Sequence, residues 1–382
     1  LENLWEGGGG REGGWRGGEG GGWAWTGVIG GGTGVLDVIH KGGVMHNRCG
    51  RGSGVARVGE YVCMDVPQPV SRRDAHAIGL TDAVLGSRDW RRLRRGFYVP
   101  AATVDALDPV QRHLVLAVAA VRASSDQAVV SHASAAAMHG LPVWGLALTR
   151  VHLTRDRKSG ARKSRTVELH GGPLSDDDVV AVGDFAVTTV ARTVVDIARS
   201  APFAVAVSIG DAALSRGLTD PPALDRQVAR AVHRYGVSAA RAVVAALDGR
   251  SESPGESRLR IALADPRIPA PQPQATILDS DGRFVARVDL LLAELGVIVE
   301  FDGKIKYGRQ LRGSKPVEQV VYEEKLREDR LRALGWIVVR VTWHDLEDHT
   351  SLINRILAAA NLGRRQARTG TWIGGSRNSQ TW

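Results

Sequence analysis

Cysteine is scarce in this sequence of 382 residues, where only Cys49 and Cys63 occur, both near the N-terminus. Two cysteines cannot supply a disulfide framework, and they argue against a zinc cluster in the body of the chain. The sequence also lacks any run of about 18 apolar residues, the length that spans a membrane. An N-terminal secretory pattern is missing as well. We therefore expect a cytoplasmic protein without a membrane partner.

Positive charge is in excess, with 50 lysines and arginines against 41 aspartates and glutamates and a net charge of +9. The hydrophobic share of 43% and the charged share of 24% are ordinary for a soluble globular protein. The chain is long enough for two or three domains. A basic balance indicates a polyanionic partner, with DNA the first candidate, and a generally basic surface is the alternative.

Glycine dominates residues 1–63, in runs such as EGGGGREGGWRGGEGGGWAW. Such a composition cannot bury enough surface to offset its ordering entropy, so we expect this segment to be disordered. Two interpretations stay open. The segment is a flexible nucleic-acid-binding arm with stacking tryptophans, or it derives from a start codon placed upstream of the native one.

Residues 64–108 outline two short helices and a basic hairpin. Ser71 and Thr81 are expected to cap the two helices, and Gly79 to end the first. The stretch RDWRRLRRG then leads into the strand-like FYV. Its arginines suit phosphate contacts, although a charge run is often only a solvated face. We expect DNA to meet the hairpin at Arg88, Arg91, Arg92, Arg94 and Arg95.

Residues 109–248 are rich in alanine and valine and alternate helices with short strands, which predicts an α/β domain. Four side chains here invite a catalytic or metal assignment: His132, His139, Asp196 and Asp211. Their spacing matches no ligand pattern, so satisfied structural roles are the better interpretation.

Residues 249–362 contain VDLLLAELGVIVEFDGKIKY, two β-prone runs around a tight turn. If the hairpin folds about Glu294 and Leu295, residue numbers across it sum to a constant, and Asp289 lies opposite Glu300. Like charges across a ladder repel, so a divalent cation such as Mg²⁺ would offset their repulsion. Asp302 and Lys304 fall on the same face if the strand continues.

Glu256, at the start of a preceding helix, could face the same cation. Phosphodiester hydrolysis needs a cation to stabilise phosphate charge, a group that activates water and often a lysine. These parts could come from Glu256, Asp289, Glu300, Asp302 and Lys304.

The order of helix glutamate, strand aspartate, strand glutamate and nearby lysine resembles the PD-(D/E)XK restriction-endonuclease-like fold. More closely, RVDLLLAELGVIVEFDGKIKY with EEKLREDRLRALGWIVVRVTWHDL resembles actinobacterial proteins that carry a very-short-patch-repair-like endonuclease domain. The resemblance implies Asp289 and Glu300 as ligands of Mg²⁺ or Mn²⁺ and Glu256 as a supporting carboxylate. It further implies substrate or second-layer contacts from the next helix by Lys325, Asp329 and Arg330.

The sequence departs from that family at two points. No proline precedes Asp289, and Asp302 stands two residues after Glu300 where the family has lysine. Read from Asp302, DGK is itself an acid-x-lysine pattern, which displaces the positive charge to Lys304. A solvated hairpin with an Arg287–Asp302 pair is the alternative without catalysis.

The upstream half is similar to AbiEi-type antitoxin proteins. VSRRDAHAIGLTDAVLGSRDWRRLRRGFYV resembles their winged helix-turn-helix, and SHASAAAMHGLP with FAVTTVARTVVDIARSA resembles the domain that follows it. The two resemblances together cover roughly residues 68–347. The polar, basic residues 363–382 are expected to be a disordered tail.

The whole chain is therefore predicted to be α/β, or α+β overall, with a winged helix-turn-helix, a middle α/β domain and a mixed sheet flanked by helices. The leading hypothesis is a DNA-binding protein with a Mg²⁺- or Mn²⁺-dependent endonuclease domain. The alternative is a non-catalytic, antitoxin-like transcriptional repressor with a degenerate nuclease domain and a cognate toxin as partner.

Overall fold

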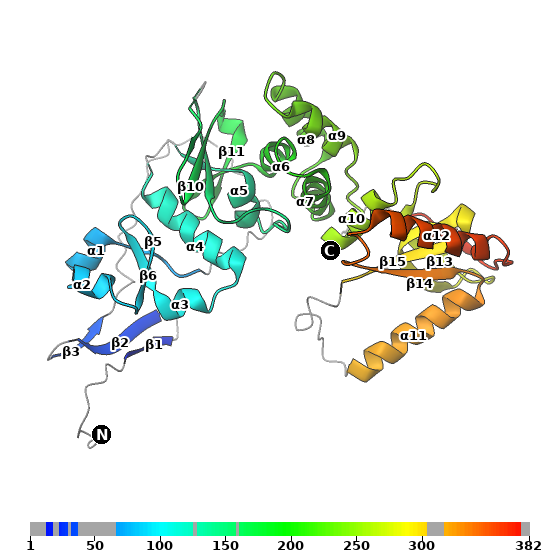
Figure 1. Ribbon diagram of the computed structural model, residues 1–382, viewed down its shortest axis with the longest axis horizontal. Helices are drawn as coiled ribbons and strands as arrows, with labels where there is room; N and C mark the ends of the chain where they lie inside the picture. Colours follow the sequence, from blue (N-terminus) through cyan, green and yellow to red (C-terminus); the bar gives the residue numbers. More distant parts are fainter. Residues whose placement is uncertain are drawn as a thin grey trace, which may run out of the picture.

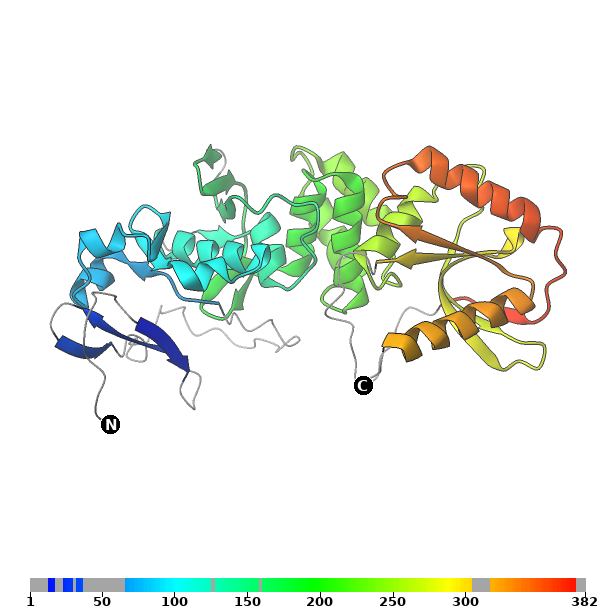
Figure 2. The ribbon, with the colours of Figure 1, turned by 60° about the horizontal axis from the view of Figure 1, so that its bottom comes forward.

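The computed structural model describes residues 66–124, 128–157, 160–303 and 317–375, together with the backbone of three strands between residues 13 and 36. The fold is mixed α/β, as the sequence predicts. Along the molecule, the elements follow one another from the N-terminal part to the C-terminal part (Figures 1 and 2). Among the described helices, none combines the length and apolar character that crossing a membrane requires.

The glycine-rich N-terminal segment contains a three-stranded antiparallel sheet, formed by β1 (Gly13–Gly17), β2 (Trp23–Ile29) and β3 (Gly32–Leu36). The expectation that residues 1–63 lack structure is therefore wrong for these strands. The reason is local, because aromatic and β-branched residues such as those of WAWTGVI favour strands. The remainder of residues 1–63, including Cys49 and Cys63, lies outside the described residues.

The next part has a three-stranded sheet of order β4-β6-β5 and three short helices. Ser71 and Thr81 accept hydrogen bonds from the backbone of Asp74 and Val84 at 3.1 and 3.4 Å, which confirms both predicted caps. The elements in chain order are β4 (Val70–Ser71), α1 (Arg72–Ala77), α2 (Asp82–Leu85), β5 (Trp90–Arg94), β6 (Phe97–Pro100) and α3 (Ala101–Asp105).

The middle part begins with a six-stranded mixed sheet of order β11-β12-β7-β8-β10-β9. Strand β10 runs parallel to β8 and β12 runs parallel to β7, while the other pairs are antiparallel. The elements are α4 (Pro109–Arg122), β7 (Val129–Val130), α5 (His132–Met138), β8 (Val151–Arg155), β9 (Arg162–Lys163), β10 (Val167–Gly171), η1 (Asp176–Asp178), β11 (Val179–Val182) and β12 (Phe185–Thr188).

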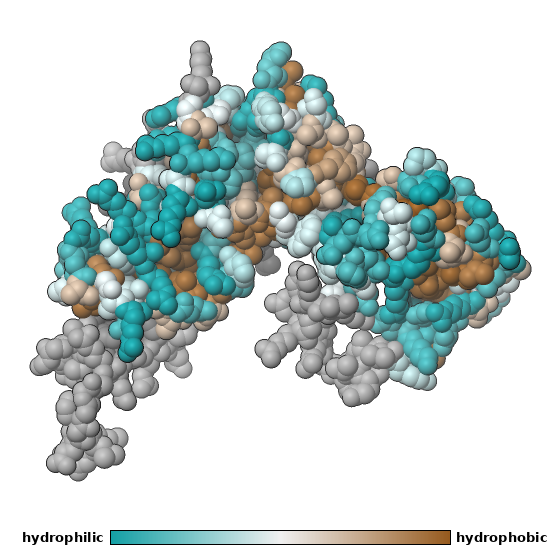
Figure 3. Space-filling model, viewed as in Figure 1, coloured by the Kyte–Doolittle hydropathy of each residue, from teal (hydrophilic) through white to brown (hydrophobic). Residues whose placement is uncertain are grey.

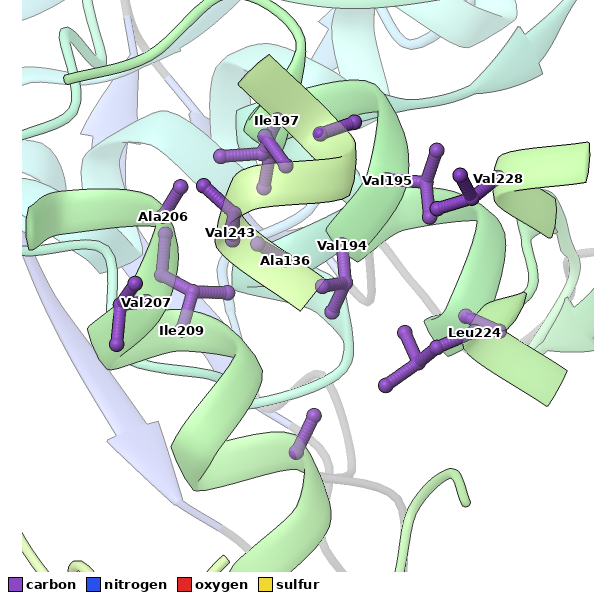
Figure 4. Close-up of a cluster of buried hydrophobic side chains, with 14 of the residues drawn as sticks. Ala136, Val194, Val195, Ile197, Ala206, Val207, Ile209, Leu224, Val228 and Val243 are labelled. Atoms are coloured by element: carbon purple, nitrogen blue, oxygen red, sulfur yellow. The ribbon is translucent and has the colours of Figure 1, made fainter. Parts of the chain in front are cut away.

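A layer of helices follows this sheet: α6 (Val190–Ala198), α7 (Phe203–Ser215), α8 (Pro221–Arg230) and α9 (Val237–Ala245). Their apolar residues form one buried cluster, which includes Val194, Ile209, Leu224 and Val243 (Figure 4). Hydrophilic residues cover most of the face in Figure 3, and hydrophobic ones come to the surface near these helices.

Buried ion pairs cross this layer. Asp196, 1% exposed, pairs with Arg192 at 2.7 Å, with Arg199 at 2.9 Å and with Arg234 at 3.4 Å. His139 contacts the carbonyl of Thr188 at 2.7 Å through Nε2. The structural interpretation of Asp196 and His139 therefore agrees with their contacts.

The C-terminal part is a five-stranded mixed sheet of order β16-β15-β14-β13-β17. Helices α11 and α12 cover opposite faces of it (Figure 1). The elements are α10 (Pro254–Ala262), β13 (Gln272–Leu278), β14 (Phe284–Leu292), η2 (Ala293–Leu295), β15 (Val297–Asp302), α11 (Val317–Ala333), β16 (Ile337–Thr342), α12 (His349–Gly363) and β17 (Thr371–Ile373).

Strand β17 corrects the expectation of a disordered tail over residues 363–382. Thr371, Trp372 and Ile373 pair with β13 and so become the edge of the sheet. The sequence misses this strand because it is three residues long and all three are exposed, so no buried alternation marks it. Residues 376–382 lie outside the described part of the chain.

Helix α10 packs against α7, which joins the middle and C-terminal parts. Asp211 of α7, 0% exposed, pairs with Arg260 of α10 at 2.9 Å and accepts the backbone N–H of Asp248 at 2.7 Å. Burial raises the pKa of Asp211. The role of Asp211 is therefore to hold the two parts together, in line with the structural interpretation.

The buried position of Asp196 yields the first prediction. Asp196→Asn leaves three arginines around a neutral amide, and breaking a buried ion pair costs about 3–5 kcal/mol. Urea unfolding followed by circular dichroism should show a loss of that size. The matched control is Asp105→Asn, whose exposed pair with Arg91 should cost less than about 1 kcal/mol. Equal losses in both variants would contradict the assignment.

Candidate functional site

The β14–β15 hairpin has the register that the sequence predicts. Leu290 pairs with Val299 and Leu292 with Val297, so the residue numbers sum to a constant. Gly296 closes the turn with φ of +68°, a left-handed conformation that glycine adopts without steric cost. The same register, extended by one residue, would place Asp289 beside Glu300.

The regular ladder is interrupted at Asp289. The Oδ2 atom of Asp289 accepts the backbone N–H of Phe301 at 2.8 Å. Val288 and Leu291 pack in the same buried cluster although they are three residues apart, so the alternation of faces breaks between them. The carboxylate thus takes the place of a backbone acceptor, which fixes it next to Glu300.

Glu256 reaches the same place from the first turn of α10. Its Oε1 accepts the hydroxyl of Ser253 at 2.7 Å, and its Oε2 accepts the backbone N–H of Glu252 at 2.9 Å. The side-chain amide of Gln274 also donates to Oε2, at 2.8 Å. Glu256 is therefore a buried carboxylate with its donors already supplied by the protein.

Gln274 occupies a strained position in β13. It falls between the paired residues Pro273 and Ala275, level with Asp289, and its φ is +54°. A non-glycine residue in this region costs of order 1–3 kcal/mol, and such residues gather at functional sites. Here the distortion turns the amide toward Glu256, a contact that the sequence analysis missed.

Glu300 is 8% exposed, and only one of its oxygens has a partner among the described residues. Its Oε2 accepts a hydrogen bond from Arg327 of α11 at 2.9 Å. Its Oε1 is buried and has no hydrogen-bond partner in the part of the chain that the structure describes. A buried unpaired carboxylate oxygen is costly, so this atom marks the place where a ligand of positive charge fits.

The pKa values of Asp289 and Glu256 are raised. Burial, the nearby Glu256 carboxylate and the Glu300 carboxylate raise the pKa of Asp289 to about 7, against the effects of the Phe301 N–H and Arg327. Burial also raises the pKa of Glu256. Shifts of this kind gather where a protein performs chemistry or binds an ion.

A cavity of about 540 Å³ opens over Asp289 and Glu300, and we call it the carboxylate cavity. Arg327 and Arg340 supply positive charge to its wall. Trp144, from the middle part, lies 5.2 Å from Trp343 between ring centroids, and Arg258 stacks on Trp144 at 4.4 Å. The lining residues are Trp144, Ser253, Pro254, Gly255, Asp289, Glu300, Phe301, Asp302, Gly303, Glu324, Arg327, Arg340 and Trp343.

The donor set fits a hard cation held by two carboxylates. Mg²⁺ binds through one or two carboxylates and keeps several waters, and Asp289 with the free Oε1 of Glu300 offers that arrangement. The described carboxylates do not form a site with three closely spaced ligand atoms. Among the described residues, three donor atoms within 4.8 Å of one another occur at His132, His152 and His170 and not at the carboxylates.

Of the two remaining residues in the predicted catalytic set, the structure describes Asp302 and not Lys304. Asp302 lines the carboxylate cavity, and Lys304 lies outside the described residues. Arg287 pairs with Glu252 at 2.5 Å.

The α11 residues predicted to contact substrate lie on a different face of the helix from those that line the carboxylate cavity. Lys325, Asp329 and Arg330 are exposed and do not line the carboxylate cavity, whereas Glu324 and Arg327 do. Residues three and four apart share a helix face, and the buried Leu331 could have marked the inner face.

The five predicted DNA-binding arginines divide into two groups. Arg88, Arg92 and Arg95 are exposed and make no ion pair among the described residues. Arg91 pairs with Asp105 at 3.2 Å. Arg94 is half-buried, donates to the carbonyl of Ala120 at 3.1 Å and has its pKa lowered by burial, so it fastens β5 to α4.

No protein-family model matches the chain, and no solved structure matches it. The chain is 30% identical over 159 residues to uncharacterized proteins of Mycobacterium tuberculosis, from strain CDC 1551 / Oshkosh and strain H37Rv. The match spans 42% of this chain and 55% of each relative, about half their length.

The raised pKa of Asp289 predicts a pH-dependent stability in metal-free buffer. The folded chain binds more protons than the unfolded one between the unfolded pKa of 3.8 and the folded value of about 7, so ionised Asp289 destabilises the fold progressively across that window. Asp289→Asn should therefore unfold at a higher temperature than the parent at about pH 8, and the gap should close near pH 4.

The matched control has the opposite sign. Arg355 and Thr342 help to lower the pKa of Asp345 to about 2 against the effect of its burial. Asp345→Asn should thus unfold at a lower temperature than the parent at about pH 8. Thermal unfolding across the pH range checks both variants, and a pH-independent shift in Asp289→Asn would contradict the account.

Proposed function

We propose that this chain is a DNA-binding protein whose C-terminal part hydrolyses phosphodiester bonds, with Mg²⁺ or Mn²⁺ held by Asp289 and Glu300. The observation that carries the proposal is the buried Oε1 of Glu300, which has no partner among the described residues and lies beside Asp289, whose pKa is raised to about 7. A bound cation would supply the positive charge that two adjacent carboxylates and a phosphate require.

The chain's own residues have separable roles in this proposal. Glu256, held by Ser253 and Gln274, lies near enough to Asp289 to raise the pKa of that carboxyl group. Arg327 and Arg340 lie in the cavity wall, where guanidinium groups can orient a phosphate. Asp302 adds a further polar group to the same wall.

The aromatic wall suits a nucleic acid. Trp144 and Trp343 face the cavity, and indole rings can stack on bases regardless of sequence. The exposed Arg88, Arg92 and Arg95 would add phosphate contacts from the β5–β6 hairpin, in keeping with the net charge of +9.

A second candidate is favoured by the ion pair between Arg327 and Glu300, 2.9 Å long. This pair offsets part of the carboxylate charge without a metal, as expected for a nuclease-like domain that has lost its chemistry. The chain would then be a non-catalytic, antitoxin-like repressor that binds DNA at its own promoter. A cognate toxin and a cytoplasmic location stay predictions for either function.

Cleavage of supercoiled plasmid by the full chain tests the leading proposal. Cleavage should require Mg²⁺ or Mn²⁺, stop in EDTA and fall at least about 100-fold in Glu300→Gln, since loss of one charge-stabilising group commonly costs that much. Glu294→Gln is the matched control, because Glu294 is exposed at the turn of the same hairpin. Promoter binding without metal-dependent cleavage would favour the repressor.

Fluorescence anisotropy with labelled duplex DNA tests the hairpin. Arg92→Ala and Arg95→Ala should weaken binding and reduce the slope of log affinity against log salt by roughly 0.9 for each lost phosphate contact. Arg226→Ala is the control, because Arg226 is equally exposed but lies on α8. An unchanged salt slope in both hairpin variants would exclude this DNA surface.

A further inference from the structure

Three histidines converge in the middle part, away from the carboxylate cavity, and we call them the histidine cluster. His132 is the first residue of α5, His152 lies in β8 and His170 in the parallel neighbour β10. The register pairs His170 with Thr154, so His152 and His170 sit two positions apart on the same face. One ring nitrogen from each of the three lies within 4.8 Å of the others.

The nitrogen positions are close to those of a metal site. His152 Nδ1 is 2.9 Å from His170 Nε2, and the His132 ring lies against His170 with centroids 3.9 Å apart. Two nitrogens at zinc–nitrogen distances of about 2.0–2.1 Å in a tetrahedron are roughly 3.3 Å apart. Separating the His152 and His170 nitrogens by a few tenths of an ångström would admit an ion.

The Nδ1 atom of His132 has a hydrogen-bond partner, as the non-ligating ring nitrogen of a metal-bound histidine usually has. Its Nδ1 contacts Ser131 Oγ at 2.9 Å, and Thr154 donates a hydroxyl proton to the same oxygen at 2.7 Å. With Nδ1 occupied in this way, Nε2 is the ring nitrogen available to the cluster. The φ of His132 is +50°, a strained value that persists only where surrounding structure enforces it.

Charged side chains of both signs lie near the histidine cluster. Neutral imidazole is the form of histidine that binds metals. Two carboxylates lie near enough to influence these rings: Asp196 acts on His132, and Glu168 acts on His152. Glu168 also pairs with Lys163 at 2.9 Å.

We propose that His132, His152 and His170 form a binding site for a transition-metal ion of the Zn²⁺ class, with three imidazole ligands. Imidazole suits zinc, copper, nickel and iron, whereas Mg²⁺ prefers oxygen, so the site is chemically distinct from the carboxylate cavity. His152 and His170 are only partly buried, which leaves a fourth position open to water or a small anion. The low cysteine count does not exclude such a site, because no thiolate takes part.

Metal content and affinity of the full chain test the proposal. His40, His46, Cys49 and Cys63 could bind zinc elsewhere, so every protein carries Cys49→Ser and Cys63→Ser. Isothermal titration with Zn²⁺ should give a site whose affinity falls at least about 100-fold in His170→Gln and in His152→Gln. The control is His344→Gln, because His344 is exposed; affinity unchanged in the two cluster variants would overturn the proposal.

Co²⁺ substitution supplies a readout that does not depend on a variant's folding. In the cysteine-free background, Co²⁺ should give the visible absorption of a four-coordinate nitrogen and oxygen site, and Zn²⁺ should bleach it. If Co²⁺ gives no such spectrum and Zn²⁺ does not bind, the proposal is overturned and the cluster is a hydrogen-bonded histidine stack alone.

Discussion

The placement of Asp289 and Glu300 in the wall of one cavity, with the Glu256 carboxylate near enough to act on Asp289, is the constraint on which the C-terminal part depends. Like charges held close together repel, so ionising Asp289 beside the Glu256 and Glu300 carboxylates is costly without compensation. The chain supplies part of that compensation itself. Glu256 has three hydrogen-bond donors, Glu300 has Arg327, and Asp289 retains a proton more readily because its pKa is raised to about 7. The Oε1 atom of Glu300 has no partner within the described ranges, and in our account it gives the cavity its affinity for a cation.

The surrounding fold is arranged to hold those groups in place. The break in β14 gives the Phe301 N–H to Asp289, and the strained Gln274 gives its amide to Glu256. Helix α10 carries Glu256 and is fastened to α7 through the pair between Arg260 and Asp211. Because Trp144 also reaches the cavity from the middle part, the site is built from two parts of the chain. Movement of one part against the other would therefore alter the cavity wall.

Sequence reasoning succeeds where local pattern determines structure. The caps at Ser71 and Thr81 and the register of the β14–β15 hairpin follow from residue type and two-residue alternation. Sequence reasoning fails where tertiary contacts determine which side chains reach the site. No local sequence pattern indicates that Gln274 or Trp144 contributes to the site. Arg327 lines the cavity, whereas the predicted Lys325, two residues earlier, lies on another face of α11. The histidines of the cluster are at least 18 positions apart in the sequence. The parallel pairing of β8 with β10 brings His152 and His170 together, and no local pattern in the sequence reveals that pairing.

Electron paramagnetic resonance of Mn²⁺ tests the central claim most directly, because it observes the cation and not its chemistry. Adding the full chain to Mn²⁺ should reduce the signal of the free ion, and adding Mg²⁺ should restore that signal. Asp289→Asn should weaken Mn²⁺ binding by at least about tenfold, the equivalent of about 1.4 kcal/mol. Binding that is equally strong in Asp289→Asn, or that Mg²⁺ does not displace, would contradict the assignment of the carboxylate cavity as the cation site.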